Sequence, residues 1–437
     1  MEEGIFTGTF YKIHRWLSLI CALFFLLLTL TGLPLLFRSE IEAWNTTNLP
    51  TTQGAQSLPE IWQGLDAGMK AFRAAYPQKQ ILAATPAPAE GTLYFLAKNR
   101  HAQDPRAHMR MGGEQIVFDQ RTGELFDRTH RTYRYPQIAS FLHTMHILHV
   151  EMGLGRGGKI FLGVMCVLTI FSIISGFMIY KPFRKGKPFG LTGRHGRGFW
   201  SDMHLGFSVF AAVFALVLTL SGVFVVLNSI GGDIYRQDAA RVAMQLVNHE
   251  GTPISPDVAL QTIETSFPNK RIVSMRFPEK DGTPYAFFLA DAGMKPTSYT
   301  RTEMAYVPSK GDLVAEFVPT PAWLSLTPLF LNLHIHNHDT LLLKIFWGIL
   351  LLACAVMTIT GAWLWFMRFR PAPSSANSSQ GNLPSGQWHV WRLPIILGVL
   401  LLLGLILPLW GGIAETLGTL AMLLALLLFL WKFRRQA

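Results

Sequence analysis

Four histidines occupy matched positions in two similar halves of the chain. The stretch "HRWLSLICALFFLLLTLTG", which begins at His14, resembles "HLGFSVFAAVFALVLTLSG", which begins at His204. The stretch "LHVEMGLGRGGKIFLG" contains His149 and resembles "LHIHNHDTLLLKIFWG", which contains His334. Two opposed imidazoles are what a haem iron with two axial histidines requires. The repeat therefore predicts two haem sites, one between His14 and His204 and one between His149 and His334.

A polar role at the membrane boundary is the alternative for each histidine taken alone. Ionisable groups in or beside membrane helices are costly, however, and tend to be functional. Two matched pairs on opposite sides of a membrane favour ligation over a purely interfacial role. The sequence has no C-x-x-C-H motif, so any haem would be held by its axial ligands and its pocket alone.

Further histidines lie next to two of the predicted ligands. His143 and His146 precede His149 with helical spacing on one broad face, so they are alternative ligands for the same haem. The choice among the three is open at this point. His336 and His338 follow His334 at alternate positions, and we favour a polar surface over a metal site for both.

Three basic residues lie close to the predicted ligands in sequence. Arg15 is adjacent to His14, and Arg156 and Lys159 follow His149. They are candidate partners for haem propionates, although such side chains also extend to lipid headgroups. The sequence contains no nucleophile–base set, phosphate-binding loop or G-x-G-x-x-G motif after a strand, so it predicts no catalytic residue and no nicotinamide or flavin site.

The elements that must position these residues are membrane helices. The chain of 437 residues is 50% hydrophobic and only 15% charged. A membrane-spanning helix needs about 20 apolar residues. Six stretches qualify, and the last two form a hairpin: Trp16–Phe37, Ile160–Tyr180, Leu205–Leu227, Leu341–Met367, Leu393–Trp410 and Leu417–Trp431.

Basic residues predict the orientation of these helices. The loop 181–200 carries six Lys and Arg residues and no acidic one, and short loops of this kind stay in the cytoplasm. Both termini are then cytoplasmic, and residues 38–158 and 228–340 lie outside. The net charge of +11 reflects this topology and does not indicate nucleic-acid binding, for which no motif is present. The partner along the spans is membrane lipid.

Each half also contains an external segment with an amphipathic helix followed by strands, which predicts two small α+β units. Because corresponding helices run in the same direction, a pseudo-two-fold axis is expected along the membrane normal. The predicted boundaries are 1–38 (first span), 39–140 (first α+β unit), 141–181 (interfacial helix and second span), 182–199 (basic loop), 200–228 (third span), 229–325 (second α+β unit), 326–370 (interfacial segment and fourth span), 371–387 (linker) and 388–437 (hairpin).

The motif order resembles a known family. "HRWLSL" opens the first span, "LH" precedes the second, "VFDQRTGELF" closes the first α+β unit, and the order then repeats. This pattern is similar to that of the PepSY-associated transmembrane proteins, iron-regulated proteins of the bacterial inner membrane that include siderophore-iron reductases of the ferrioxamine reductase type. The resemblance implies a four-helix core with two b-type haems on His14, His204, His149 and His334, and two periplasmic PepSY domains.

The resemblance also implies a function. Electrons would enter at the inner haem from a quinol or a cytoplasmic reductase, cross to the outer haem and reduce a ferric siderophore in the periplasm from Fe(III) to Fe(II), which releases the iron. Two alternatives stay open: a non-redox permease or binding protein for metal or siderophore, and a PepSY-based regulator of an extracytoplasmic partner. The C-terminal hairpin departs from the family pattern, and its role is open.

Overall fold

The computed structural model forms two compact units. It describes residues 2–47, 57–87, 91–99, 114–127, 133–184, 189, 196–292, 303–324, 326–335, 340–367, 387–410 and 412–434. The helical unit comprises Met1–Ala43, Tyr135–Asn228 and Leu329–Ala437. The sheet unit comprises Trp44–Arg134 and Ser229–Pro328.

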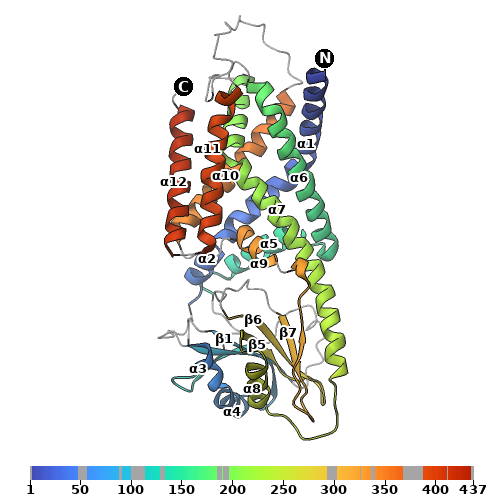
Figure 1. The fold of residues 1–437 in the computed structure, drawn as a ribbon. Coiled ribbons are helices and arrows are strands. Elements are labelled where there is room, and N and C mark those ends of the chain that lie inside the picture. The colour runs from blue at the N-terminus through green and yellow to red at the C-terminus, as the bar shows by residue number, and fades with distance from the viewer. Residues whose placement is uncertain are drawn as a thin grey trace, which may run out of the picture. The chain divides into compact units, whose positions relative to one another are not determined.

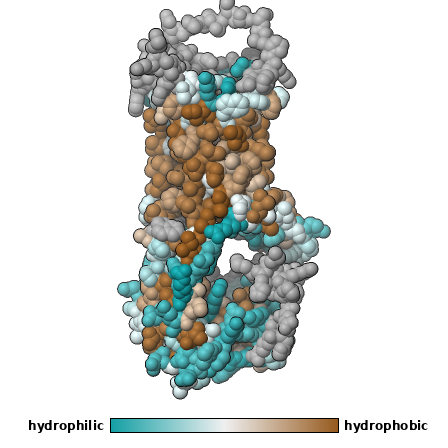
Figure 2. All heavy atoms as spheres, turned by 90° about the vertical axis from the view of Figure 1, so that its right-hand side faces the viewer, coloured by the Kyte–Doolittle hydropathy of each residue, from teal (hydrophilic) through white to brown (hydrophobic). Residues whose placement is uncertain are grey.

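Within the described residues, six helices are long and apolar enough to cross a membrane, as the sequence predicts. They run side by side in one bundle (Figure 1). On the face seen in Figure 2, apolar side chains cover most of the height of this bundle. The six helices are α1 (Glu2–Leu36), α6 (Gly155–Arg184), α7 (Gly196–Gln245), α10 (Leu341–Met367), α11 (Gln387–Ile406) and α12 (Gly412–Arg434).

Helix α7 differs most from its predicted span, because it continues for 18 residues after Leu227. The additional residues include good helix formers such as alanine, arginine, glutamine and methionine. Tyr235 and Ala239 from this part of the helix are buried in the sheet unit against Met304 and Tyr306. The end of the apolar run is therefore not the end of the helix.

The two halves of the bundle make equivalent contacts. A Cβ atom added to Gly163 on α6 would lie 3.2 Å from Val226 on α7. A Cβ atom added to Gly348 on α10 would lie 3.7 Å from Leu33 on α1. Each glycine thus lets the second helix of one half approach the first helix of the other half, as expected for halves related by a pseudo-two-fold axis.

Short helices precede α6 and α10. Helix α5 (Pro136–Glu151) carries His149, and α9 (Thr327–His334) ends at His334. Helix α2 (Arg38–Asn45) follows α1. The turn from α5 into α6 is only three residues long and begins with the left-handed residues Met152 (φ 52°) and Gly153 (φ 72°), which reverse the chain direction sharply.

The C-terminal helices α11 and α12 form the predicted hairpin, joined by the 3-10 turn η2 (Leu407–Trp410). Helix α12 packs on α7 through aromatic side chains. The rings of Phe210 and Phe429 are stacked with centroids 4.5 Å apart, and Phe433 lies edge-on to Phe207 at 6.0 Å. The hairpin is thus an integral part of the helical core.

The sheet unit contains one antiparallel sheet with the strand order β4-β3-β2-β1-β5-β6-β7-β8. The sequence predicts two small α+β units, one in each half, and the strands of both join in one sheet, because β1 pairs with β5 at Ala83↔Arg276 and Ala84↔Met275 (Figure 1). The strands are β1 (Lys79–Ala87), β2 (Thr92–Asn99), β3 (Glu114–Asp119), β4 (Leu125–Asp127), β5 (Lys270–Arg276), β6 (Tyr285–Asp291), β7 (Glu303–Val307) and β8 (Glu316–Val318).

A shared core explains why the halves join. Helices α3 (Leu58–Gln63), α4 (Leu65–Ala75) and α8 (Pro256–Ser266) contribute to one hydrophobic cluster with the strands of both halves. Each half alone is small, and small domains bury too little of their surface to be stable by a wide margin. The largest fully buried side chains of the shared cluster include Phe72 and Phe95 from the first half and Met275 and Phe287 from the second.

The repeat extends to an ion pair in each half. Lys79 pairs with Glu114, and the equivalent Lys270 Nζ lies 2.5 Å from Glu303 Oε2 and 2.6 Å from Asp291 Oδ1. Burial lowers the pKa of Lys270, but its hydrogen bonds with Asp291 and Glu303 outweigh burial and raise the pKa above its ordinary value. These pairs tie the first strand of each half to the strands beyond it.

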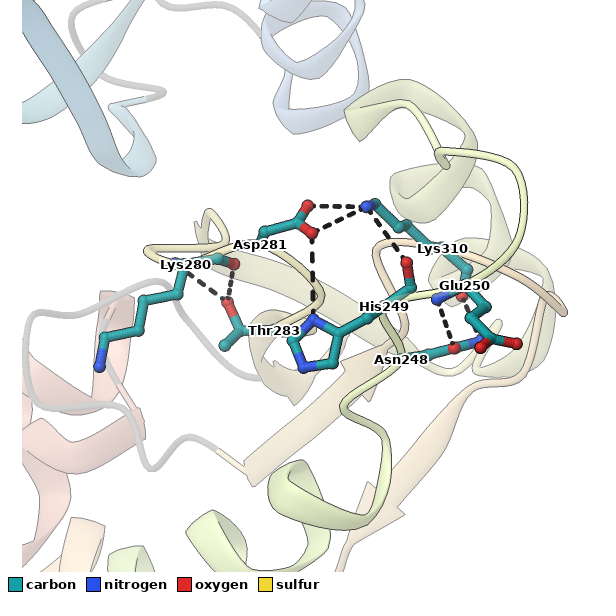
Figure 3. Close-up of polar contacts among 7 residues, drawn as sticks. All are labelled: Asn248, His249, Glu250, Lys280, Asp281, Thr283 and Lys310. Carbon is teal, nitrogen blue, oxygen red and sulfur yellow. Dashed lines mark hydrogen bonds and ion pairs between the residues drawn. The ribbon is translucent and has the colours of Figure 1, made fainter.

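A second polar cluster joins three surface turns of the sheet unit (Figure 3). Lys310 Nζ lies 2.8 Å from Asp281 Oδ1, and His249 Nδ1 lies 3.9 Å from Asp281 Oδ2. Its hydrogen bond with Lys310 holds the pKa of Asp281 below the ordinary value. A Cβ atom at Gly282 (φ 76°) would lie 2.6 Å from the Asn248 carbonyl oxygen, so the turns pack closely. This exposed cluster fastens loops together.

Candidate functional site

The four repeated histidines come together as two pairs. The ring centroids of His14 on α1 and His204 on α7 are 6.5 Å apart. Those of His149 on α5 and His334 on α9 are 6.1 Å apart. Each pair takes one ring from each half of the chain, which is the arrangement that the repeat predicts. We call them the inner pair (His14 and His204) and the outer pair (His149 and His334).

The spacing of each pair suits a shared metal ion. An imidazole nitrogen binds a transition metal at about 2.0–2.1 Å, and this nitrogen lies roughly 1 Å from the ring centre, so two rings on opposite sides of one ion have centroids about 6 Å apart. The observed separations of 6.5 Å and 6.1 Å match this value. Both separations are therefore compatible with one metal ion held between the two rings.

Hydrogen bonds fix the protonation pattern of the inner pair. His14 Nδ1 lies 2.8 Å from the Ser172 carbonyl oxygen, and His204 Nδ1 lies 2.9 Å from the Met357 carbonyl oxygen. A carbonyl oxygen only accepts, so Nδ1 must carry the proton and donate. Nε2 of each neutral ring then keeps its lone pair. A second nitrogen held in this way is the usual support for a histidine that ligates a metal.

The outer pair has the same pattern. His334 Nδ1 lies 3.2 Å from the Leu218 carbonyl oxygen. His149 Nδ1 lies 3.0 Å from Thr31 Oγ1, whose own hydroxyl donates to the Leu27 carbonyl oxygen at 2.8 Å. Because the Thr31 proton is used in that bond, the hydroxyl oxygen accepts from His149. Nε2 is unprotonated here too.

A hydroxyl residue followed by glycine receives each of the four rings. Each core helix supplies one such dipeptide, whose hydroxyl lies 3.0–3.5 Å from Nδ1 of the histidine. A Cβ atom on the glycine would lie only 2.9–3.4 Å from the ring, so the ring rests directly on the helix backbone. The four dipeptides are Thr31-Gly32 for His149, Ser175-Gly176 for His14, Ser221-Gly222 for His334 and Thr360-Gly361 for His204.

The two pairs lie at different depths of the bundle. His14 and Gly32, the glycine beneath His149, are 18 residues apart on α1. At 1.5 Å per residue they are about 27 Å apart along the helix, close to the hydrocarbon thickness of a bilayer of about 30 Å. One pair therefore lies toward each end of the spanning region.

A largely apolar cavity of about 360 Å³ surrounds the inner pair. His14 and His204 both line it, Trp391 of the hairpin forms part of its wall, and Arg15 and Arg197 supply positive charge. Nε of Arg15 is buried and has no hydrogen-bond partner among the described residues. Two imidazoles, an apolar wall and an unpaired buried guanidinium nitrogen fit a flat apolar group with anionic substituents, such as haem. Sequence analysis selected Arg15 but missed Arg197.

The other predicted site residues lie away from the pairs. His143 and His146 are exposed on α5, so the structure selects His149 among the three candidates. Arg156 is exposed, and Lys159 Nζ lies 3.9 Å from Glu151 Oε2.

His336 and His338 fall outside the described residues. In the part of the chain that the structure describes, no three His, Cys, Asp or Glu side chains form a group that could hold a metal ion. Within the described residues, each pair therefore offers two imidazole ligands to a metal ion.

Residues 11–368 match the family model of the PepSY-associated TM region. The chain is a membrane protein that belongs to this family. The match contains all four paired histidines and ends before the C-terminal hairpin. No curated protein matches the chain.

Proposed function

We propose that the chain is a di-haem b oxidoreductase of the bacterial inner membrane that reduces ferric siderophores on the periplasmic side. Electrons come from a quinol or a cytoplasmic reductase. In this proposal both termini are cytoplasmic, and the sheet unit consists of two PepSY domains in the periplasm. The six spanning helices and the basic loop 181–200 support this orientation.

The observation that carries the proposal is the pair geometry. In each pair the ring centroids of two imidazoles lie 6.1–6.5 Å apart, and the hydrogen bonds of Nδ1 leave Nε2 of each neutral ring unprotonated. A haem b would be held by His14 and His204 in the inner pair and by His149 and His334 in the outer pair. The described residues include no further group of His, Cys, Asp or Glu that could hold a metal ion.

Other residues of the chain orient the rings, supply positive charge and exclude water. Ser172 and Met357 orient the inner rings through their carbonyl oxygens, and the glycines let the rings approach the helices closely. Arg15 and Arg197 provide counter-charge for carboxylates at the edge of the inner cavity. The apolar wall excludes water from the iron.

The chemistry needs no acid or base from the protein. A haem held by two histidines would supply one-electron transfer. The substrate iron accepts one electron and changes from Fe(III) to Fe(II). Chelators built from hard oxygen ligands hold Fe(II) less tightly, so reduction releases the metal.

The visible spectrum of the detergent-purified protein tests this proposal. We expect sharp α and β bands after reduction with dithionite and two haems per chain by the pyridine haemochrome assay. Re-oxidation of the reduced protein by a series of ferric chelates would then identify the substrate class. A colourless preparation from haem-replete cells would overturn the proposal. It would favour a non-redox permease or binding protein, or a regulator of an extracytoplasmic partner, instead.

A further inference from the structure

A buried carboxyl group lies in the C-terminal hairpin, where the haem proposal gives it no role. Glu415 is in the first turn of α12 and only 9% of its surface is exposed. Charged residues are almost never this buried without a partner, and inside a membrane they are functional candidates.

The partner of Glu415 is the start of another helix. Thr340 precedes α10, and its carbonyl oxygen accepts the first helical hydrogen bonds from the amides of Leu343 and Lys344 at 3.1 and 3.3 Å. Thr340 is therefore the N-cap of α10. The backbone N–H of Thr340 donates to Glu415 Oε1 at 3.1 Å.

This contact replaces a missing local one. In a capping box, the side chain three residues after the N-cap accepts the N-cap N–H, and glutamate or glutamine serves this purpose. The residue in that position here is Leu343, which has no acceptor. Glu415 supplies the carboxyl oxygen from a different helix. It also lies in the first turn of α12, so one carboxyl group serves the amino-terminal ends of two helices, where negative charge is favourable.

Thr340 is the last residue of the link between His334, at the end of α9, and the start of α10. Helix α9 ends at His334 and α10 begins at Leu341. In the first half, the link from α5 to α6 has three residues and is closed by a hydrogen bond from the Leu154 amide to the Glu151 carbonyl oxygen. The second link, 335–340, has six residues, of which 336–339 lie outside the described part of the chain.

A second tie holds the same turn of α10. Lys344 Nζ lies 2.5 Å from Glu40 Oε1 and 3.2 Å from Ser39 Oγ, both at the start of α2. The beginning of α10 is thus fixed from two sides, by α2 of the family core and by α12 of the appended hairpin.

We infer that Glu415 is a positioning residue for His334: by accepting the Thr340 amide it fixes the far end of the link that carries the outer ligand. The consequence for haem rests on the proposed function. The hairpin beyond the family match therefore supports the outer site through α12, in addition to lining the inner cavity with Trp391.

The test compares Glu415→Leu with Glu415→Gln in the full-length protein. Glutamine keeps an acceptor oxygen, and leucine does not. The control is Thr419→Val, because Thr419 is also buried on α12 but donates only to the Glu415 carbonyl oxygen within its own helix. Hydrogen–deuterium exchange at the amides of Thr340 and Ile335 gives a readout that does not need haem, and the g values of the low-spin haem signals report ligand orientation.

We expect Glu415→Leu to speed exchange of the Thr340 amide roughly tenfold, as for a lost hydrogen bond to a charged group, and to speed that of Ile335. The outer haem signal should shift while the inner one is retained, which also shows that the protein is folded. Glu415→Gln and Thr419→Val should behave like the unchanged protein. Equal exchange in all variants, or equal damage to both haems, would overturn the inference. Absence of haem from the unchanged protein would remove the proposed function, and the exchange data would still decide whether Glu415 braces this link.

Discussion

Nδ1 of His204 lies 2.9 Å from the carbonyl oxygen of Met357, three residues before Thr360-Gly361 on α10. The Thr360 hydroxyl bonds back to the Val356 carbonyl oxygen at 2.7 Å, and the glycine leaves the space in which the ring lies. One turn of helix therefore sets the tautomer, the orientation and the depth of the ligand together.

Gly361→Ala should impair the inner site. The new Cβ atom would lie 2.9 Å from His204 Cε1, which is closer than real side chains approach, so the ring must move. We expect loss of most of the inner haem and retention of the outer haem in the reduced spectrum. Gly348→Ala on the same helix is the matched control, because its nearest neighbour would be at an ordinary 3.6 Å. Equal spectra of the two variants would contradict the role of Gly361 in giving the His204 ring the space that it occupies against α10.

His149→Ala should remove one of the two proposed haems. Its ring faces His334 with centroids 6.1 Å apart, whereas His146 is exposed on the same helix. The haemochrome content should fall by about half, since loss of one axial ligand leaves the other pair intact. His146→Ala and His143→Ala should keep the full content. A loss with either of those variants and none with His149→Ala would show that α5 presents a different ligand.

Arg15→Leu should weaken retention of the inner haem. The buried Nε of Arg15 lacks a protein partner among the described residues, which suits a propionate. Removal of a charged hydrogen bond predicts roughly tenfold to hundredfold faster loss of haem to a scavenger protein. Arg156→Leu is the control, because Arg156 is exposed. Unchanged loss from the Arg15 variant would assign this arginine to lipid headgroups instead.

The pair of Glu40 and Lys344 should make stability depend on pH. Burial raises the pKa of Glu40, but hydrogen bonds led by that from Lys344 outweigh burial and lower the pKa below its ordinary value of 4.5. A lowered folded-state pKa stabilises the protein above pH 4.5, and this contribution is lost as the pH falls through the lower value.

Glu40→Gln should therefore reduce thermal stability at pH 7 by about 1 kcal/mol, a small figure because the Glu40 side chain is partly exposed to screening solvent. The difference in melting temperature between the unchanged protein and Glu40→Gln should become smaller below pH 4.5. Glu42→Gln serves as the control, since Glu42 pairs with Arg38 on the exposed surface of the same helix. A difference that stays constant from pH 7 to pH 3 would exclude this ion pair as its source.

Met275→Ala should destabilise both halves of the sheet unit together. Met275 is fully buried and lies opposite Ala84 where β1 meets β5. A truncation of this kind costs about 2–5 kcal/mol. Hydrogen exchange should increase in β2 and β6 alike, because the two halves share one core. Met244→Ala, at a position 74% exposed, should change neither strand. Faster exchange confined to β6 would show that the halves unfold separately.

The sequence predicts the parts of this structure that follow from periodicity and repetition. Apolar length was sufficient for the six spans, and the duplicated His14 and His204 motifs were sufficient for the pairing of histidines across the bundle. The repeat predicted His149 as the partner of His334 but left His143 and His146 as alternatives, because all three share one broad helical face. Their exposure is decided by packing of α5 against α1, which helical spacing does not specify.

Pairing of β1 with β5 also left no signal in the sequence. Both strands read as ordinary antiparallel strands, and an edge that pairs with a partner has the same alternation as an edge that faces solvent. The four hydroxyl-glycine dipeptides that contact the histidine rings were visible as repeats, but their role depends on which helix faces which ring. Arg197 was missed because it is seven residues from His204 and becomes relevant only through the cavity.

Each imidazole pair takes one member from each half of the chain, so neither half alone contains a complete site. A single copy of the motif would have to associate with an identical molecule to bring two such rings together. Two copies in one chain make that association permanent and leave each half free to carry changes that the other lacks.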